Sequence, residues 1–443
     1  MPSGYLFFME LGNMANLKDQ LEIRLHDNNN KRPGDIRNSF QRDKGRVIHS
    51  AGFRRLQGKT QVMGVGEGDF HRTRLTHSIE CAQIGGGILG VLKNRDGLLD
   101  DNLRAWLPST DLIEAACYAH DIGHPPFGHG GEMALHSKMY NHGGFEGNAQ
   151  TLRILTKLEK YSNLGHGIDP TRRLILSILK YPISYNFFNP CDYKNKPPKC
   201  FYEEDMDVYD WCVSVFDKSD IENFSNTSDG KSIHHSFDCS IMEMADDIAY
   251  GVHDLEDIVA RGLASRDSVE KCLREAFASI GGSYIYRGKV FNADVICGML
   301  YKDSFSRKTA ISELVNLFIT NIFLEKKEKF NSVLLDYKVV IPDDLGRLLK
   351  SFKGFAHELV IKKPNVFQLE TRGKLLVSKL FDALISNPDS LIPSQSWQDL
   401  LAISGGDRYR AVSDYISGMT DRYAEKVYHR LYTPGFGSSS DEL

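Results

Sequence analysis

The densest group of potential metal ligands and proton-transfer groups in this 443-residue chain lies between Cys117 and Glu132. The segment reads Cys-Tyr-Ala-His-Asp-Ile-Gly-His-Pro-Pro-Phe-Gly-His-Gly-Gly-Glu and holds three histidines and two carboxylates within sixteen residues. Imidazole beside carboxylate suits a first-row divalent metal ion. The adjacent His120-Asp121 pair can complete such a site only if other ligands arrive from elsewhere. The chain must therefore fold so that distant segments pack around this one.

The neighbouring sequence places the His-Asp pair at the end of a helix. The apolar run over residues 111–119 predicts a helix, which Gly123 and the Pro125-Pro126 pair must end. The pair then faces a loop. A single histidine in a Gly/Pro loop is commonly a surface residue or a helix cap, but three histidines with two acids favour a functional site.

Two other predicted helices carry suitable ligands. One begins near Arg72 and contains His77, and helix packing can bring this imidazole to His120. The other covers residues 241–258, where Asp246, Tyr250 and Asp254 share one face at i, i+4 and i+8. The plain alternative is an acidic face turned toward water. Small apolar neighbours of Asp246 and Tyr250 favour a buried helix instead.

The remaining sequence predicts an all-α fold. Helical patterns cover residues 46–62, 72–84, 169–182, 314–326, 344–352, 369–385 and 408–424, the 169–182 helix with Asp169 as its cap. Short strands are predicted only over residues 283–286 and 332–341, and irregular polar segments over 183–204 and 218–236. We expect an N-terminal solvated arm over residues 1–45, a core over 46–262 with insertions near 183–236, and a C-terminal helical region over 263–443 packed on the core.

Composition and motif searches narrow the classes of protein. The formal net charge of −4 gives no whole-molecule attraction to nucleic acid or to an anionic membrane. Eight cysteines without a CxxC pair predict reduced thiols in a cytoplasm. The apolar stretch over residues 4–9 is too short for a signal peptide or a membrane span. No P-loop, dinucleotide-binding glycine fingerprint or serine nucleophile elbow is present.

Six ordered strings resemble one enzyme family. They are FRRLQGKTQV at 53–62, RLTHS at 74–78, HDIGHPPFGHGGE at 120–132, FEGNAQ at 145–150, ADDIAY at 245–250 and DYISGMTD at 414–421. The order of His77, His120-Asp121 and Asp246 is similar to that of the HD phosphohydrolase superfamily. The longer strings resemble its bacterial deoxyguanosinetriphosphate triphosphohydrolases (dGTPases) and dGTPase-like proteins, over about residues 31 to 430.

The resemblance implies a fold, a reaction and a cofactor. It implies an all-α cytoplasmic enzyme, usually a homo-hexamer, that hydrolyses dGTP or several deoxynucleoside triphosphates (dNTPs) to deoxynucleoside and tripolyphosphate. The implied cofactor is a divalent ion, with Mn, Mg and Fe left open. By the family pattern, the implied metal ligands are His77, His120, Asp121 and Asp246.

The same resemblance implies roles for other side chains. His129 and Glu132 would form a catalytic pair beside the α-phosphate, and their i, i+3 spacing supports this if a helix begins near Gly128. His124 would contact phosphate. Tyr250 would lie against the sugar, with Gln61 and Asp254 on its 3′-hydroxyl. The full set of implied substrate-binding residues is Gln61, Val62, Arg74, Lys199, Tyr250 and Asp254, with Lys180 as a further cation near the phosphates.

Two other functional classes are compatible with these residues. A different HD enzyme, such as a nucleotidase or a cyclic-dinucleotide phosphodiesterase, would share the metal ligands but would not need the His129–Glu132 pair. A mainly nucleic-acid-binding protein is the non-enzyme alternative, and single-stranded DNA is also a candidate partner for the enzyme. The acidic net charge argues against nucleic-acid binding as the main role. The basic residues available to line such a groove are Arg46, Arg54, Arg55, Lys59, Arg72 and Arg74.

Overall fold

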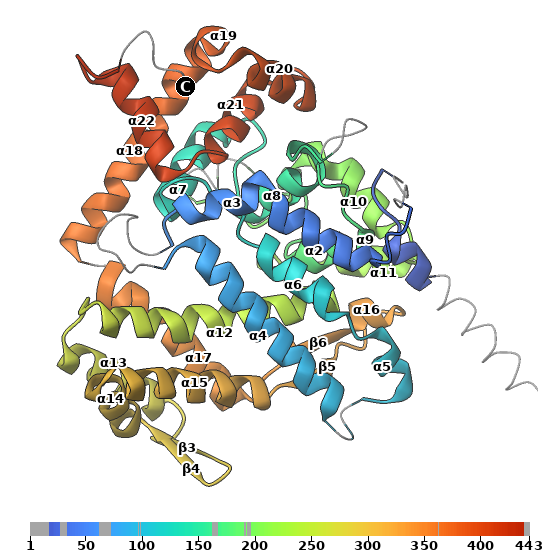
Figure 1. The fold of residues 1–443 in the computed structure, drawn as a ribbon. Coiled ribbons are helices and arrows are strands. Elements are labelled where there is room, and N and C mark those ends of the chain that lie inside the picture. Colours follow the sequence, from blue (N-terminus) through green and yellow to red (C-terminus); the bar gives the residue numbers. More distant parts are fainter. Residues whose placement is uncertain are drawn as a thin grey trace, which may run out of the picture.

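The computed structural model describes residues 17–26, 33–61, 72–95, 97, 99–161, 167–189, 192, 196–361 and 363–437. Helices account for most of these residues, and the short strands pair two at a time (Figure 1). The all-α class predicted from the sequence is therefore confirmed.

The main hydrophobic core forms around one long helix, α12 (Phe237–Ala260). The Ser236 side chain caps this helix by accepting a hydrogen bond from the backbone N–H of Cys239. Ile248, Val252 and other apolar residues of α12 are fully buried. The helices packed against α12 include α4 (Arg74–Asn94), α6 (Thr110–Ala119), α9 (Arg172–Ile178), α15 (Ser304–Thr320) and α17 (Asp343–Ala356).

A second apolar cluster joins C-terminal helices to α7 (Gly128–Met139). Leu135 of α7 and Phe381 of α18 (Pro364–Ser386) are both buried in it. Figure 1 shows the C-terminal helices in orange and red around α7, on one side of the molecule. The segment between α6 and α7, which carries the clustered histidines, therefore runs from the first cluster to the second. The other helices of the second cluster are α20 (Ser394–Ile403), α21 (Arg408–Ser417) and α22 (Asp421–Tyr432).

The remaining described elements are short or peripheral. The antiparallel strand pairs are β1 (Thr227–Ser228) with β2 (Lys231–Ser232), β3 (Ser283–Tyr286) with β4 (Lys289–Asn292), and β5 (Phe323–Lys326) with β6 (Tyr337–Val340). The helices are α2 (Ser39–His49), α3 (Ala51–Arg55), η1 (Leu56–Gly58), α5 (Asp101–Trp106), α8 (Gly147–Arg153), η2 (Ile154–Leu158), η3 (Tyr185–Phe187), η5 (Glu203–Asp205), α10 (Met206–Val213), α11 (Lys218–Phe224), α13 (Arg266–Ala278), α14 (Ala293–Lys302), α16 (Val333–Asp336), η6 (His357–Ile361) and α19 (Pro388–Leu391).

Two predicted helices are each divided by a capping residue. The helix predicted over residues 46–62 is instead α2 followed by α3, because the Ser50 side chain accepts a hydrogen bond from Phe53 N and starts a new helix. The helix predicted over residues 408–424 becomes α21 and α22, with Thr420 as the cap of α22. Hydrophobic periodicity does not reveal such internal caps.

The helix predicted over residues 169–182 begins later than expected. Its cap is Thr171, whose side chain accepts a hydrogen bond from Leu174 N. The prediction of Asp169 as the cap is wrong. Asp169 has a left-handed φ of 52°, and its carboxylate accepts a hydrogen bond from His26 N.

Long-range pairing changes three other predictions. The helix predicted over residues 314–326 ends at Thr320, and its last residues form β5, which pairs with β6. The strand predicted over 332–341 therefore begins at Tyr337, after the helical turn α16. The polar loop predicted over 218–236 contains α11 and the β1–β2 hairpin.

Parts of residues 17–45 are packed on the body, whereas residues 33–38 are mostly exposed, and the N-terminal arm stays a prediction. Arg24 is buried and forms an ion pair with the buried carboxylate of Asp43, with 2.6 Å between Nη1 and Oδ1. The other oxygen of Asp43 accepts a hydrogen bond from Thr171 Oγ1 at 2.6 Å. Part of the polar composition of this segment thus reflects a buried network around the Arg24–Asp43 ion pair.

Two findings concern the membrane and the thiols. Within the described ranges, no helix combines the length and apolar composition needed to cross a bilayer. All seven cysteines placed by the structure are free and buried.

Candidate active site

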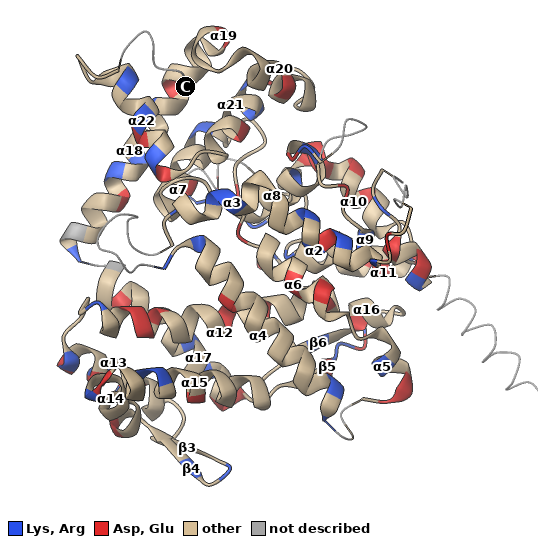
Figure 2. Ribbon diagram, in the orientation of Figure 1, with Lys and Arg blue, Asp and Glu red and all other residues tan. Residues whose placement is uncertain are grey.

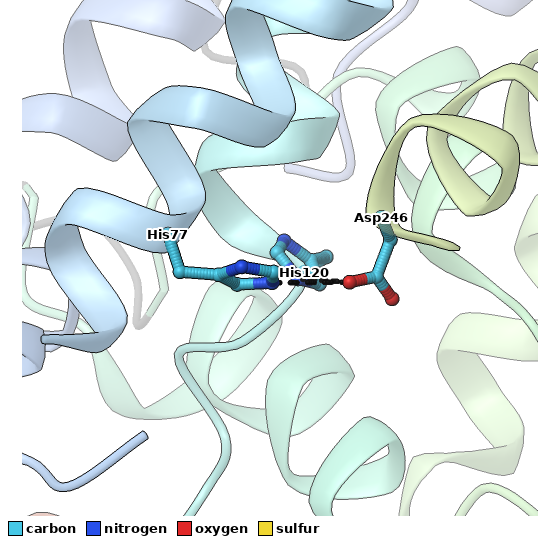
Figure 3. A group of neighbouring side chains, drawn as sticks. All are labelled: His77, His120 and Asp246. Carbon is cyan, nitrogen blue, oxygen red and sulfur yellow. Dashed lines mark hydrogen bonds and ion pairs between the residues drawn. The ribbon is translucent and has the colours of Figure 1, made fainter. Parts of the chain in front are cut away.

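Three predicted metal ligands converge from three helices. His77 comes from α4, His120 caps the end of α6, and Asp246 comes from α12 (Figure 3). Asp246 Oδ1 lies 3.1 Å from His77 Nε2 and 3.4 Å from His120 Nε2. One potential ligand atom from each residue lies within 4.8 Å of the other two. Packing of α4 and α6 against α12 creates this group.

The chemistry of this group fits a cation. His120 Nδ1 lies 2.6 Å from the carbonyl oxygen of Cys117, which orients the ring so that Nε2 faces the carboxylates. Nε2 is buried and has no hydrogen-bond partner among the described residues. Burial lowers the pKa of His120, but the carboxylates of Asp121 and Asp246 raise it to about 10. A proton on His120 thus supplies positive charge where a metal ion would.

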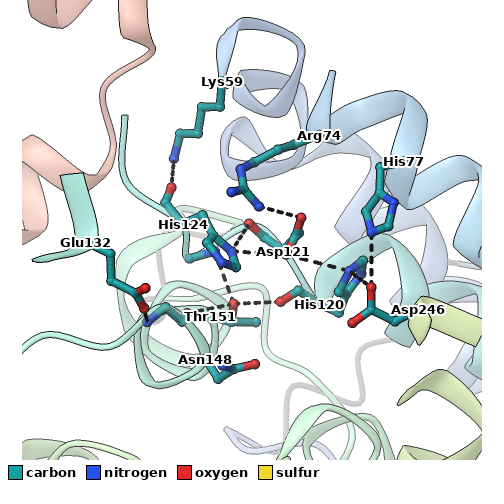
Figure 4. A network of polar contacts seen from close by, with 12 residues as sticks. Lys59, Arg74, His77, His120, Asp121, His124, Glu132, Asn148, Thr151 and Asp246 are labelled. Atoms are coloured by element: carbon teal, nitrogen blue, oxygen red, sulfur yellow. Dashed lines mark hydrogen bonds and ion pairs between the residues drawn. The ribbon is translucent and has the colours of Figure 1, made fainter. Parts of the chain in front are cut away.

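The fourth predicted ligand, Asp121, lies beside this group but faces Arg74 and His124. Its Oδ2 accepts a hydrogen bond from Arg74 Nη1 at 2.7 Å, and its Oδ1 lies 3.0 Å from His124 Nδ1 (Figure 4). Its Oδ1 is also 3.6 Å from His120 Nε2. Metal ligation by Asp121 stays a prediction, and the structure adds an ion pair with Arg74.

Lys180 supplies a further positive charge at the candidate metal site. Its Nζ lies 3.0 Å from Asp246 Oδ2, on the carboxylate oxygen that does not face the imidazoles. The Lys180 side chain is mostly buried. Burial opposes its charge, but Asp246 holds the pKa of Lys180 well above its usual range. Lys180 therefore stays protonated beside the candidate metal ligands.

His129 and Glu132 form a hydrogen-bonded pair on the first turns of α7. This helix begins at Gly128, as the predicted i, i+3 spacing requires. His129 Nδ1 lies 3.3 Å from Glu132 Oε2, while Glu132 Oε1 accepts a hydrogen bond from Gly147 N at 3.0 Å. The hydrogen bond to Glu132 raises the pKa of His129. Glu132 is buried, whereas the His129 side chain is 60% exposed and can meet a ligand.

These groups open onto one large cleft of about 1210 Å³ between the helical core and the C-terminal helices. His77, Asp121 and Asp246 lie in its wall with His124 and His129. Three cations, one aromatic ring and one amide predicted to bind substrate complete this part of the lining, namely Arg74, Lys180, Lys199, Tyr250 and Gln61. The structure thus brings most of the predicted site residues to a single cleft.

Lys199 reaches the cleft from the segment before α10. Its Nζ lies 2.5 Å from Glu146 Oε1. Glu146 caps α8 by accepting hydrogen bonds from Asn148 N and Ala149 N. The Glu146 carboxylate therefore holds Lys199 against the same helix that supports Glu132 through Gly147.

The predicted sugar-binding residues occupy two places. Tyr250 lines the main cleft, whereas Asp254 lines a much smaller cavity behind it, and Gln61 borders both. Gln61 Oε1 and Asp254 Oδ2 are buried and have no hydrogen-bond partner within the described residues. Two polar atoms therefore remain for a ligand or a water molecule. Val62 lies outside the described residues.

Asp254 lies in an acidic environment near the C-terminal end of α12. Arg72 contacts Glu80 and Asp257 there, and Figure 2 shows acidic residues gathered at this end of α12. Burial raises the pKa of Asp254 to about 8 against the lowering effect of Arg72. Asp257 and Glu80 add to the rise. The side chain is thus mostly protonated at neutral pH and can donate a hydrogen bond.

Several cleft residues were not singled out in the sequence. Lys353 of α17 pairs with Asp247 of α12 at 2.5 Å, and Arg372 of α18 forms an ion pair with Glu425 of α22. Asp247 lies within the string at 245–250 but was given no role, whereas Lys353, Arg372 and Glu425 lie outside all six strings. Other lining residues outside the six strings are Tyr181, His357, Glu370 and Arg422, while Thr60, Phe127, Asn148 and Asp421 lie within the strings but were given no role.

Most basic residues proposed for a nucleic-acid groove have partners inside the protein. Arg46 donates to the carbonyl oxygens of Ile168 and Asp169, and Lys59 is fully buried. Arg72 and Arg74 form the ion pairs described above. Arg46, Lys59 and Arg72 are therefore poorly placed to line an open groove, whereas Arg74 lines the cleft.

Comparison with known proteins identifies, along most of the chain, the family that the sequence strings resemble. Residues 74–221 match the HD domain, and residues 339–430 match the phosphohydrolase-associated domain. The chain is 41% identical to deoxyguanosinetriphosphate triphosphohydrolase-like protein 2 of Deinococcus radiodurans, over 92% of this chain and 95% of the relative. It is 39% identical to the deoxyguanosinetriphosphate triphosphohydrolase-like proteins of Shewanella baltica (94% and 97% covered) and Aliivibrio fischeri (96% and 100% covered). The chain therefore belongs to the dGTPase-like family of HD-domain phosphohydrolases.

Proposed function

We propose that this protein hydrolyses deoxynucleoside triphosphates to deoxynucleoside and tripolyphosphate. The observation that carries the proposal is that one cleft is lined by His77 and Asp246 of the candidate metal group and by His129 of the His129–Glu132 pair. The names of the relatives, which refer to triphosphohydrolase-like proteins, support the substrate class. A nucleotidase or a cyclic-dinucleotide phosphodiesterase would need the first group but not the second.

The proposed cofactor is one divalent ion, with Mn, Mg and Fe as candidates. His77, His120 and Asp246 would hold it, and Asp121 would join them if it turned from its present contacts with Arg74 and His124. When bound, such an ion supplies positive charge to the phosphoryl oxygens and so stabilises the charge that develops during hydrolysis. Arg74, with Lys180 and Lys199, would neutralise further phosphate charge from the surrounding wall of the cleft.

His129 is the proposed proton-transfer residue. Its Nδ1–H donates to Glu132 in the tautomer that this contact favours, which leaves Nε2 to take or deliver a proton at the reacting phosphate. Glu132 is in turn held by Gly147 N. His124 would contact a phosphate oxygen through Nε2, because its Nδ1 faces Asp121.

Sugar recognition would come from the α12 side of the cleft. Tyr250 would pack against the deoxyribose, and its bulk would leave no room for a 2′-hydroxyl. Gln61 and Asp254 would bind the 3′-hydroxyl through Oε1 and Oδ2, which have no hydrogen-bond partner among the described residues. Val62 is proposed as a further contact of the same substrate on the basis of the family resemblance.

The products of the reaction test this proposal directly. The protein is incubated with each dNTP and with mixtures, in Mn or Mg, and the products are followed by phosphorus NMR. Tripolyphosphate and deoxynucleoside in equal amounts are expected, and His129→Ala should abolish their formation. Mixtures are needed because one dNTP can activate hydrolysis of another in an assembly with several sites. Orthophosphate as the first product, or no hydrolysis in any mixture, would refute the proposed reaction.

Several expectations from the sequence stay predictions. They are the homo-hexameric assembly, the cytoplasmic location, a role for single-stranded DNA, and the division into an arm, a core over residues 46–262 and a C-terminal region. Light scattering of the purified protein would measure the assembly.

A further inference from the structure

The string DYISGMTD at residues 414–421 resembles the family but has no role in the proposed reaction. It ends α21 and begins α22, on the C-terminal side of the cleft. In the structure it contacts three segments: residues 55–60, which precede Gln61; Phe127, in the loop between His124 and His129; and residues 150–153 of α8. The string therefore connects the C-terminal helices to the catalytic part of the chain.

The carboxylate of Asp421 bridges two of these segments. Oδ2 accepts hydrogen bonds from the backbone N–H of Thr60, at 3.0 Å, and from the Thr60 hydroxyl. Oδ1 accepts a hydrogen bond from Phe127 N at 2.9 Å. Thr60 precedes Gln61, and Phe127 lies two residues before His129. A single buried side chain thus fixes the spacing between the proposed sugar contact and the proposed proton-transfer residue.

Lys59 makes a second bridge beside the first. Its buried Nζ donates to His124 O at 2.6 Å and to Ser417 O at 2.9 Å, and Figure 4 shows the link from Lys59 to the carbonyl group of His124. These oxygens are the two hydrogen-bond acceptors found for this ammonium group within the described residues. A buried ammonium group is costly unless hydrogen bonds satisfy it. Its burial therefore couples His124 to the position of α21.

Close packing reinforces both bridges. A Cβ atom at Gly58 would lie 2.9 Å from the Thr420 side chain, and one at Gly418 would lie 3.2 Å from Arg55 Nη1. Asp414 accepts hydrogen bonds from Gln150 Nε2 and Arg153 Nε, both at 2.9 Å. The string at 414–421 thus packs closely against residues 55–60 and 150–153.

The backbone at Phe127 is the part of the loop that needs support. Phe127 has a φ of 61°, in the left-handed region that residues other than glycine rarely adopt. Its N–H is the group that donates to Asp421. Its side chain packs on α18, where a Cβ atom at Gly373 would lie only 2.5 Å from Phe127 Cβ. The C-terminal helices therefore contact the strained residue through both its backbone and its side chain.

We propose that Asp421 is a positioning residue, which holds the loop from His124 to His129 in its active geometry. This role rests on the proposed function only for its kinetic consequence, since the contacts exist independently of the reaction. Misplacement of a catalytic group by about 1 Å can lower the rate about a hundredfold. Asp421→Asn replaces one of the two acceptor oxygens with an amide N–H₂, which cannot accept a hydrogen bond from Thr60 or Phe127.

The test combines hydrogen exchange with kinetics on the full-length protein. Asp421→Asn is compared with wild type and with Asp382→Asn, a matched change in α18 whose side chain is 58% exposed and pairs with Lys138 of α7. We expect exchange of the amide hydrogens in peptides containing Thr60 and Phe127 to become about tenfold faster or more. We also expect kcat to fall about tenfold to a hundredfold. The amount of bound metal and the KM should both change little. Asp382→Asn should alter neither measurement.

Each outcome decides the proposal. Unchanged exchange at both peptides, or an unchanged kcat in the folded variant, would overturn it. A raised KM with unchanged kcat would instead identify Asp421 as a substrate contact. If Asp421→Asn does not fold, Asp421→Glu keeps the charge and both acceptors, and it should have intermediate exchange rates and an intermediate kcat. A wild-type protein without activity would refute the proposed function, while the exchange data would still report on the bridge.

Discussion

Asp254→Asn tests the protonation state of the acid behind the cleft. Asp254 is 5% exposed, its Oδ2 lacks a hydrogen bond within the described structure, and its pKa is raised from 3.8 to about 8. The nearby Arg72 already pairs with Glu80 and Asp257, so little of its charge is left for Asp254. Between pH 3.8 and 8, the native state thus holds a proton on Asp254 that the unfolded chain has released.

The sign and size of the effect follow from this difference in bound protons. When the native state binds one more proton than the unfolded state, the free energy of unfolding falls by about 1.4 kcal/mol per pH unit as the pH rises. From pH 5 to pH 8, Asp254 should therefore cost the native state about 4 kcal/mol. Asparagine does not titrate, so Asp254→Asn should remove this part of the pH dependence. The variant should be more stable relative to wild type at pH 8 than at pH 5.

Urea unfolding of both proteins at pH 5, 6, 7 and 8 measures how the difference in their free energies of unfolding changes with pH. Asp210→Asn, an exposed change in α10, controls for the loss of one formal charge. The asparagine amide can donate a hydrogen bond as the protonated acid does, so Asp254→Asn should also keep most of its hydrolytic activity at pH 7, unlike Asp254→Ala. Parallel stability curves for wild type and Asp254→Asn would show that the acid is ionised throughout and would refute the reasoning.

Three further changes test other parts of the site. Asp246→Ala removes the oxygen that faces both imidazoles and leaves Lys180 buried without its partner. The variant should therefore lose bound metal and unfold at a lower temperature than wild type. Full metal occupancy in the variant would contradict the ligand assignment. Tyr250→Ala should narrow the difference between the kcat/KM values for dGTP and GTP, and an unchanged ratio in a folded variant would identify this tyrosine as a packing residue. Glu132→Gln removes the carboxylate that raises the pKa of His129, so the limb of the pH–rate profile that reports this imidazole should move to lower pH. A profile that did not move would show that His129 does not control the rate.

The sequence predicted well those features that depend on neighbours along the chain. The end of α6 at His120 followed from Gly123 and the proline pair, and the start of α7 matched the i, i+3 spacing of His129 and Glu132. Helical periodicity also placed Asp246 and the cleft residue Tyr250 on one face of α12. These relations hold because a helix sets the directions of its side chains over a few residues.

Capping and pairing were predicted less well. Ser50 divides a helix that its apolar pattern extended, and Thr171, not Asp169, caps α9. Residues 323–326 have a helical pattern but form β5, because their partner strand lies at residues 337–340. A segment with a weak local preference for helix can form a strand when a distant segment forms backbone hydrogen bonds with it.

The arrangement of the site was decided by tertiary structure. The sequence alone determined the kinds of groups available, their spacing within each helix and the resemblance to one family. Only the packed structure turned Asp121 toward Arg74 and His124, separated Asp254 from the main cleft, and brought Asp421 to Thr60 and Phe127. Spacing within a helix is set by its own backbone hydrogen bonds, whereas contacts between segments hundreds of residues apart depend on how the whole core packs.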